Sequence, residues 1–166
     1  MNSSYVATKW LLIALVVLLV AALGAGRLGL LQGSAPRDLG VRDGRLKPPS
    51  KTPNSVSSQA ALYPDSARRA EAQIAPLRFQ GDDASAMARL KALVEATEGA
   101  QVRKSEPGYL YATYTTPLMR FVDDVEFWLD PVGGTLQVRS ASRIGYGDRG
   151  ANRARIEALR ARFEAP

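Results

Sequence analysis

An uncharged, strongly apolar run over residues 10–26 (WLLIALVVLLVAALGAG) constrains this chain more than any other feature. Lys9 precedes the run, Arg27 ends it, and further leucines follow. A helix that crosses the hydrocarbon core of a bilayer needs roughly 20 apolar residues, with about 17 as the lower limit. The sequence therefore predicts an N-terminal tail over residues 1–8 and a single-pass transmembrane anchor over residues 9–31.

A cleaved signal peptide is the alternative interpretation of the same run. Residues 22–24 (ALG) provide a small-x-small cleavage site, although a weak one. The apolar region of a signal peptide normally spans about 7–15 residues, and this run is slightly longer. We favour the anchor for that reason and keep the signal peptide as the alternative.

The chain contains no cysteine and no histidine. Disulfides, thiol nucleophiles and cysteine-ligated zinc are therefore excluded, and so is the commonest general base at neutral pH. Any chemistry has to use carboxylates, lysine, tyrosine, serine or arginine. From the sequence we accordingly assign no catalytic residue, no metal ligand and no cofactor.

The formal net charge of +6 is unevenly distributed along the chain. The basic excess lies in residues 27–69, whereas acidic and basic groups balance in residues 70–166. A nucleic-acid-binding domain would concentrate basic charge on the fold, so we predict no nucleic-acid partner. A basic segment beside an apolar helix instead suits anionic headgroups, which makes membrane lipid the first predicted partner.

Beyond the anchor, residues 32–60 predict a basic tether and residues 61–166 an α+β domain. The tether lacks apolar periodicity and is rich in proline, glycine and serine. In the domain we expect a short edge strand over residues 74–79, a helix from Asp82 or Asp83 to Gly99, strands over residues 101–105, 109–116, 124–130 and 135–144, and a helix over residues 152–163. The main elements, in the order α-β-β-β-β-α, predict a small antiparallel four-stranded sheet with helices on one face.

Four carboxylates in residues 120–131 (RFVDDVEFWLDP) raise the question of an active site. Pairing Asp130 with Thr135 across the connecting loop places Glu126 opposite Arg139. Cross-strand charge pairs of this kind are ordinary sheet stabilisation. The acids that share this face, Asp124, Glu126 and Asp130, are two and four residues apart, which spreads them too far along the strand for one metal ion.

The same register separates the two neighbouring aspartates. Asp124 shares the face of Glu126 and lies one diagonal step from Arg139 and Arg143, whereas Asp123 points to the core side. A carboxylate on the core side has to be hydrogen-bonded or lie at the rim. Asp123 therefore either ties down a loop through backbone N–H groups or belongs to a polar site.

A second candidate lies in residues 139–155 (RSASRIGYGDRGANRAR), where a glycine-punctuated loop leads into a helix. A helix N-terminus attracts anions, which favours a binding site. Alternatively, the loop is satisfied by Asp148 as its own cap and by Asp123 or Asp124. The ligand-binding hypothesis comprises the following residues: Asp123, Asp124, Arg139, Arg143, Asp148 and Arg149.

Four separated motifs together resemble the domain of unknown function 1499 family. They cover residues 46–60, 74–79, 121–131 and 138–160. The resemblance implies that Asn54, Ser57 and Ser58, a motif within the tether, belong to the family's pattern, and it brings no accepted catalytic residue. The family is bacterial, with plant relatives directed to the thylakoid lumen, which corresponds to the exterior side of a bacterial membrane.

The orientation of the domain is contested by two arguments. The basic residues after the apolar helix outnumber Lys9 and the amino terminus, which by the positive-inside rule favours the cytoplasm. The resemblance favours the opposite side. We predict a single-pass protein of the bacterial inner membrane with a periplasmic domain, and keep a cytoplasmic domain as the alternative.

The predicted function is a membrane-anchored envelope domain that binds or assembles rather than catalyses. Its predicted partners are membrane lipid, another envelope protein or a small anion. The alternative is a hydrolase at the membrane that uses Asp123 or Asp124, with Arg139 and Arg143 as electrostatic clamps. That alternative requires a pocket that holds these groups.

Overall fold

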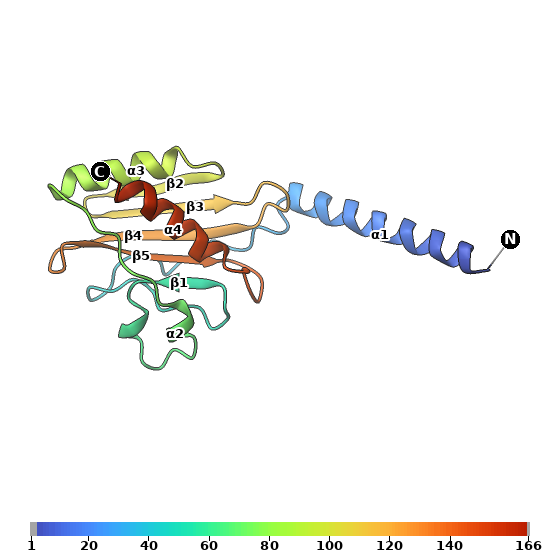
Figure 1. Cartoon of the computed structure of the whole chain (residues 1–166), viewed down its shortest axis with the longest axis horizontal. Coiled ribbons are helices and arrows are strands. Elements are labelled where there is room, and N and C mark those ends of the chain that lie inside the picture. The colour runs from blue at the N-terminus through green and yellow to red at the C-terminus, as the bar shows by residue number, and fades with distance from the viewer. Residues whose placement is uncertain (1–2, 166) are drawn as a thin grey trace.

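The computed structural model describes residues 3–165, which form one long helix and an α+β domain (Figure 1). The helix, α1 (Ser3–Arg27), projects from one end of the domain with its apolar side chains exposed. By length and composition α1 is able to cross a membrane, and a signal sequence would pass the same test. The predicted N-terminal apolar helix is thus confirmed. That it is a membrane anchor rather than a signal peptide stays a prediction.

The domain is built on an antiparallel sheet with strand order β1-β5-β4-β3-β2. The strands are β1 (Ser55–Ser57), β2 (Ala100–Glu106), β3 (Tyr109–Thr115), β4 (Val122–Asp130) and β5 (Thr135–Ser142). The α+β class and the antiparallel sheet are confirmed, but the predicted number of four strands is wrong. The fifth strand is β1, which comes from residues assigned to the tether. A three-residue strand is too short for its sequence to show the alternation of apolar and polar residues that predicts a strand. It forms because Val56 pairs with Ser140, far along the chain.

Strands β4 and β5 pair in the predicted register, from Asp130 opposite Thr135 to Glu126 opposite Arg139. Since successive side chains of a strand point to opposite faces, this register fixes which face each acid occupies. Residues 74–79, expected to form an edge strand, contribute only a bridge between Leu77 and Leu136.

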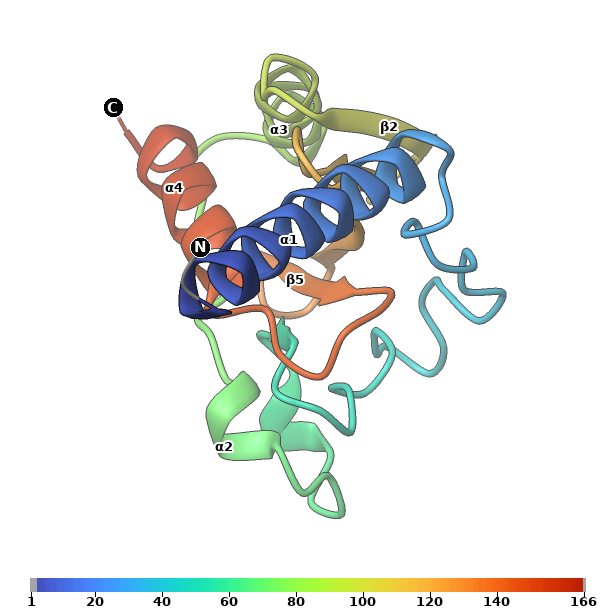
Figure 2. The ribbon, with the colours of Figure 1, turned by 90° about the vertical axis from the view of Figure 1, so that its right-hand side faces the viewer.

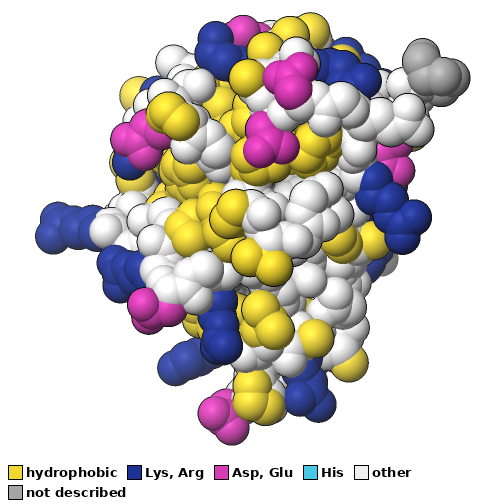
Figure 3. All heavy atoms as spheres, turned by 90° about the vertical axis from the view of Figure 1, so that its left-hand side faces the viewer, with side chains coloured by type: hydrophobic (Ala, Val, Ile, Leu, Met, Phe, Trp, Pro, Cys, Tyr) yellow, Lys and Arg dark blue, Asp and Glu magenta, His cyan; other side chains and the backbone are white. Residues whose placement is uncertain are grey.

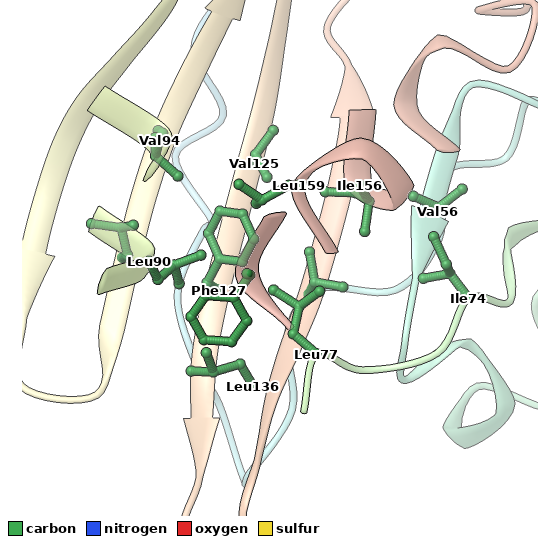
Figure 4. Close-up of a cluster of buried hydrophobic side chains, with 14 of the residues drawn as sticks. Val56, Ile74, Leu77, Leu90, Val94, Val125, Phe127, Leu136, Ile156 and Leu159 are labelled. Carbon is green, nitrogen blue, oxygen red and sulfur yellow. The ribbon is translucent and has the colours of Figure 1, made fainter. Parts of the chain in front are cut away.

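Two helices, α3 (Asp83–Glu95) and α4 (Ala151–Phe163), cover one face of the sheet (Figure 1). Asp82 begins α3 by accepting a hydrogen bond from the Ser85 N–H at 2.9 Å. The short helices η1 (Ala60–Leu62) and α2 (Arg69–Ala72) lie beside β1. Between helices and sheet the core buries Val56, Ile74, Leu77, Leu90, Val94, Val125, Phe127, Leu136, Ile156 and Leu159 (Figure 4). Each large side chain buried there stabilises the fold by about 1.5–3 kcal/mol.

The other face of the sheet is covered by the chain that follows α1. Figure 2 shows this chain on the side of the sheet away from α4. The Gly40 N–H donates to Glu126 Oε1 at 2.7 Å, and the Pro48 carbonyl accepts from Arg139 Nε at 3.2 Å. Residues 34–50 therefore form a lid over the polar face of the sheet.

The end of the sheet away from α1 carries the β2–β3 and β4–β5 turns. Apolar side chains gather on this end, between basic and acidic ones (Figure 3). A surface hollow of about 740 Å³ lies there, lined among others by Met87, Pro107, Trp128 and Leu129.

Candidate functional site

Two ion pairs lie side by side on the polar face of the sheet, under residues 34–50. The first joins Asp124 of β4 to Arg143, which directly follows β5. Arg143 Nη2 donates to Asp124 Oδ1 at 2.8 Å and its Nε donates to Oδ2 at 2.9 Å. The Tyr111 hydroxyl donates to the same carboxylate at 2.6 Å. Both oxygens of Asp124 are thus occupied by a two-point arginine contact, the strong form of charge-assisted hydrogen bond.

The pKa values of its partners reflect this arrangement. The hydrogen bond to Asp124 raises the pKa of Arg143 above its ordinary value. Burial and the nearby Asp124 carboxylate raise the pKa of Tyr111 to about 12. Arg143 is therefore charged and Tyr111 neutral at physiological pH.

The second pair joins Glu126 of β4 to Arg139 of β5, directly opposite. Both residues are buried, and Arg139 Nη1 lies 3.9 Å from Glu126 Oε2. Glu126 Oε1 accepts from Gly40 N–H and, at 2.8 Å, from the Tyr109 hydroxyl. Among residues 3–165, Glu126 Oε2 has no hydrogen-bond partner. Burial raises the pKa of Glu126 and lowers the pKa of Arg139, because both charges lie away from water.

Glu126 leads to a pH-dependent prediction. Its pKa is raised above the ordinary 4.5, so in the window above 4.5 the folded state holds a proton that the unfolded state has released. The folded state therefore loses stability as the pH rises through this window. We expect the free energy of unfolding of the native chain, relative to the Glu126→Gln variant, to fall as the pH rises from 4.5 towards neutrality. Urea unfolding of the full chain in detergent micelles measures it.

Asp130→Asn provides a control of opposite sign. Hydrogen bonds from the Gly133 and Val132 N–H groups lower the Asp130 pKa, so the native chain should lose stability relative to this variant as the pH falls. The free energy of unfolding of the native chain relative to Glu126→Gln could instead stay constant or increase with pH. Either result would contradict the expectation that burial disfavours the charged form of Glu126.

A surface cavity of about 380 Å³ opens beside these two ion pairs. It lies between the polar face of the sheet and the chain that follows α1. Its charged lining consists of Lys47, Lys51, Asp124, Arg139 and Arg143. Asp124 pairs with Arg143, and the acids that pair with Lys47 and Arg139, namely Asp38 and Glu126, lie outside the lining, so the lining itself is basic. We call it the basic cavity.

Asp123 lies on the opposite face, as predicted, and holds a different partner from the one expected. Arg155 of α4 donates from Nη2 to Asp123 Oδ2 at 2.5 Å, so a guanidinium rather than backbone N–H groups satisfies this carboxylate. Arg155 Nη1 also donates to Ser140 Oγ at 3.1 Å and to Asn152 Oδ1 at 2.7 Å. The Arg155 guanidinium lies 4.7 Å from the centre of the Tyr114 ring. This network joins α4 to the sheet and does not reach the basic cavity.

Asp148 precedes α4 (N-cap Gly150) and accepts hydrogen bonds at its start, which agrees with one of the two predicted alternatives. It accepts hydrogen bonds from the N–H groups of Asn152 and Gly150, both at 2.9 Å. Burial opposes ionisation of Asp148, but these hydrogen bonds outweigh it and lower its pKa. Arg149 is exposed and lies outside the lining of the basic cavity. The six predicted site residues are therefore distributed, and only Asp124, Arg139 and Arg143 share one cavity.

The motif of Asn54, Ser57 and Ser58 holds β1 and its neighbouring loop to the rest of the fold. The Asn54 amide donates to the Gly145 carbonyl at 2.9 Å. Ser57 Oγ accepts from the Gln59 N–H at 3.2 Å, and Ser58 Oγ accepts from the Val138 N–H at 2.8 Å. These hydrogen bonds give the motif a structural role, and none of the three residues lines the basic cavity.

Sequence reasoning missed the cations that the lid contributes, Lys47 and Lys51. Their basic character was visible in the sequence, but nothing in a proline-rich segment indicates that it folds back on a sheet. It also missed Arg155, although a signal exists. Asn152, Arg155, Ile156 and Leu159 fall at helical spacing, which predicts that Arg155 shares the inward face of α4.

The family model of the proteins of unknown function DUF1499 matches residues 45–163. The chain belongs to this family. The match begins within the lid and ends with the last residue of α4, so the matched region includes all five strands and most of the basic cavity's lining. Comparison with curated proteins and with solved structures found no match. Membership of DUF1499 assigns no activity to any residue.

Proposed function

We propose that this chain is a single-pass inner-membrane protein whose domain binds an anionic, phosphate-type group in the basic cavity. The function is binding rather than catalysis. The observation that supports it is the charge of the cavity lining, where four cationic side chains outnumber one carboxylate. Arg143 pairs with Asp124, Arg139 lies near Glu126 and Lys47 pairs with Asp38, so Lys51 is the cation of this lining that forms no ion pair among the described residues.

The two arginines suit a bound oxyanion because they are held in place before it arrives. Arg143 is oriented by Asp124, and Arg139 is buried and held by the Pro48 carbonyl. A preorganised guanidinium loses little freedom on binding an oxyanion. Lys51 forms no ion pair with any described residue and remains available for an anion.

The position of the cavity favours a headgroup near the membrane. Ser34 and Pro36 also line it, only a few residues after α1 ends at Arg27. A phospholipid headgroup and a free phosphate offer the same chemistry, so the experiment has to separate them. Assembly with another envelope protein would use the same anchor and a different surface.

Removing lysines from the cavity tests this proposal. We expect Lys51→Gln to weaken phosphate binding by about tenfold, since a charge-assisted hydrogen bond contributes roughly 1.5–3 kcal/mol. Calorimetry on the full chain in zwitterionic detergent measures binding of inorganic phosphate and of glycerol 3-phosphate. Nanodiscs containing phosphatidylglycerol, compared with phosphatidylcholine, report on the lipid headgroup.

Lys91→Gln is the matched control, because Lys91 lies on α3 across the sheet and pairs with Glu95 on the surface. No saturable binding of any of these three probes would overturn the proposal. If Lys51→Gln and Lys91→Gln weakened phosphate binding equally, the binding would be non-specific attraction to positive charge, and the proposed site would be overturned.

The hydrolase alternative lacks a free base at the cavity. Asp124 is held by Arg143 and Tyr111, and Asp123 lies on the other face with Arg155. A general base has to accept a proton from the attacking water, and a carboxylate in a two-point arginine contact is a poor acceptor. Release of inorganic phosphate from glycerol 3-phosphate would favour the hydrolase over binding.

We also propose that the domain lies in the periplasm. The support is the family's relationship to exported plant proteins. The basic residues that follow α1 favour the opposite orientation by the positive-inside rule. A reporter fused to the C-terminus that is active only outside the cytoplasm tests it, and activity of a cytoplasmic reporter at the same position would reverse the orientation.

A further inference from the structure

The domain is joined closely to the end of α1 rather than hanging from a long tether. A Cβ added to Gly26, in the last turn of α1, would lie 2.6 Å from the Met119 carbonyl oxygen. Past the helix, a Cβ on Gly33 would lie 2.7 Å from Ile144 Cγ2. The chain therefore leaves α1 in contact with two loops of the domain, residues 116–121 and residues 143–150.

Both loops lie at the end of the sheet from which α1 departs (Figures 1 and 2). This follows from the topology, because β3 and β5 run in the same direction and each loop follows the end of one of them. If α1 crosses a bilayer, the surface of that bilayer meets the chain at the last turn of α1. The same surface then faces the two loops.

Large apolar side chains are exposed around this junction. Leu28 is 79% exposed, Leu30 is 72% exposed and Leu118 is 61% exposed. Phe121 and Ile144, at 36% each, belong to the same end. They come from three separate segments of the chain, so the patch is assembled by the fold and not by one apolar stretch. Contiguous exposed apolar patches of this kind mark interaction sites.

The charges around the patch are basic. Arg27, Arg120 and Arg149 are exposed there, and the nearby acid, Asp148, is turned into the start of α4. Glu98 is an exposed acid at the same end of the sheet, since the next residue, Gly99, accepts from the Thr115 N–H at 2.8 Å. The three arginines outnumber it. Arg120 and Arg149 have φ angles of 59° and 53°, a backbone conformation that costs energy for residues other than glycine. Both loops therefore hold an arginine in a strained position at this end of the domain.

We infer that this end of the domain docks on the surface of an anionic bilayer, with the side chains of Leu118 and Ile144 in the interface and the surrounding arginines on the headgroups. The inference rests on the proposed anchor and not on the basic cavity. Apolar side chains enter the headgroup and acyl boundary while arginines stay at the headgroup level, which matches this arrangement. The apolar hollow at the opposite end faces away from the bilayer.

The absence of cysteine makes depth measurement direct. Single variants Leu118→Cys, Ile144→Cys, Leu15→Cys and Val132→Cys carry a nitroxide spin label in the full chain, reconstituted in phosphatidylglycerol nanodiscs. Leu15 lies in the middle of α1, and Val132, 96% exposed, lies in the β4–β5 turn at the far end. We expect labels at 118 and 144 to be about threefold less accessible to a water-soluble nickel relaxant than the label at 132, as for side chains about 5–10 Å into the interface.

Three outcomes distinguish the claims. A water-accessible label at Leu15 would show that α1 is not in the bilayer, which overturns the proposed anchor. A lipid-buried label at 15, with labels at 118 and 144 as accessible as at 132, overturns the docking inference alone. Replacing Arg120 and Arg149 with glutamine, or phosphatidylglycerol with phosphatidylcholine, should make the label at 118 more accessible, and an unchanged label would remove the headgroup role of the arginines.

Discussion

Replacement of Arg155 by methionine is expected to destabilise the domain by about 3–5 kcal/mol, because it leaves a buried carboxylate without its partner. The Asp123 side chain is 6% exposed, and Arg155 is the cation that reaches it. The same substitution also removes the hydrogen bonds that Arg155 donates to Ser140 Oγ and Asn152 Oδ1, in the interface between α4 and the sheet. Urea unfolding of the full chain in micelles, followed by circular dichroism, measures the change.

The double variant Asp123→Asn/Arg155→Met separates loss of the pair from loss of packing. Asparagine carries no charge, so much of the stability lost in Arg155→Met should return. Arg162→Met is the matched control, because Arg162 is an exposed arginine of the same helix that hydrogen-bonds Thr97 Oγ1 at 3.3 Å and pairs with no described carboxylate. The expected change is below about 0.5 kcal/mol. A loss below about 1 kcal/mol for Arg155→Met would contradict a buried ion pair that joins α4 to the sheet.

Replacement of Arg139 by methionine should have an effect of similar size, about 3 kcal/mol at neutral pH, since it strands the buried carboxylate of Glu126. This loss should shrink at acid pH. Glu126 already has a raised pKa, and without Arg139 it takes up a proton more readily and becomes neutral. The same variant should weaken phosphate binding in the basic cavity, so stability and calorimetry measure two consequences of one change.

The double variant Glu126→Gln/Arg139→Met should recover most of the stability but not the phosphate binding. Arg103→Met is the control, because Arg103 is an exposed arginine of the same sheet that hydrogen-bonds Thr113 Oγ1. An Arg139→Met variant that loses equal stability at about pH 5 and at about pH 7 would contradict the coupling to Glu126.

The β4–β5 register shows how much of the site was predictable. A turn-forming loop after Asp130 and the alternation of apolar side chains leave one register that buries Phe127 and Val125 together. That register places Glu126 beside Arg139 and Asp124 near Arg143, as observed. Helices α3 and α4 followed from their apolar periodicity and from capping side chains, which are also local signals.

The lid and β1 were not predictable for a physical reason. Residues 34–57 carry no periodic pattern, and their order comes from single contacts with distant residues, such as the Gly40 N–H with Glu126 and Asn54 with the loop after β5. Each contact is favourable only because the sheet already presents its partner. A proline-rich, basic segment that is a tether by composition thereby becomes one wall of a cavity.

The question raised by four clustered acids now has a different answer for each. By itself, the sequence determined the apolar helix, the neutral α+β domain and the faces of its strands, because these depend on composition and on periods of two and 3.6 residues. Only the tertiary structure decided that Arg155 holds Asp123, that a lid buries Glu126 with Arg139, and that two loops assemble an apolar and basic patch beside α1. These outcomes depend on which distant side chains meet, and contacts of that kind are stabilised by burial in the finished fold rather than by any local preference of the chain.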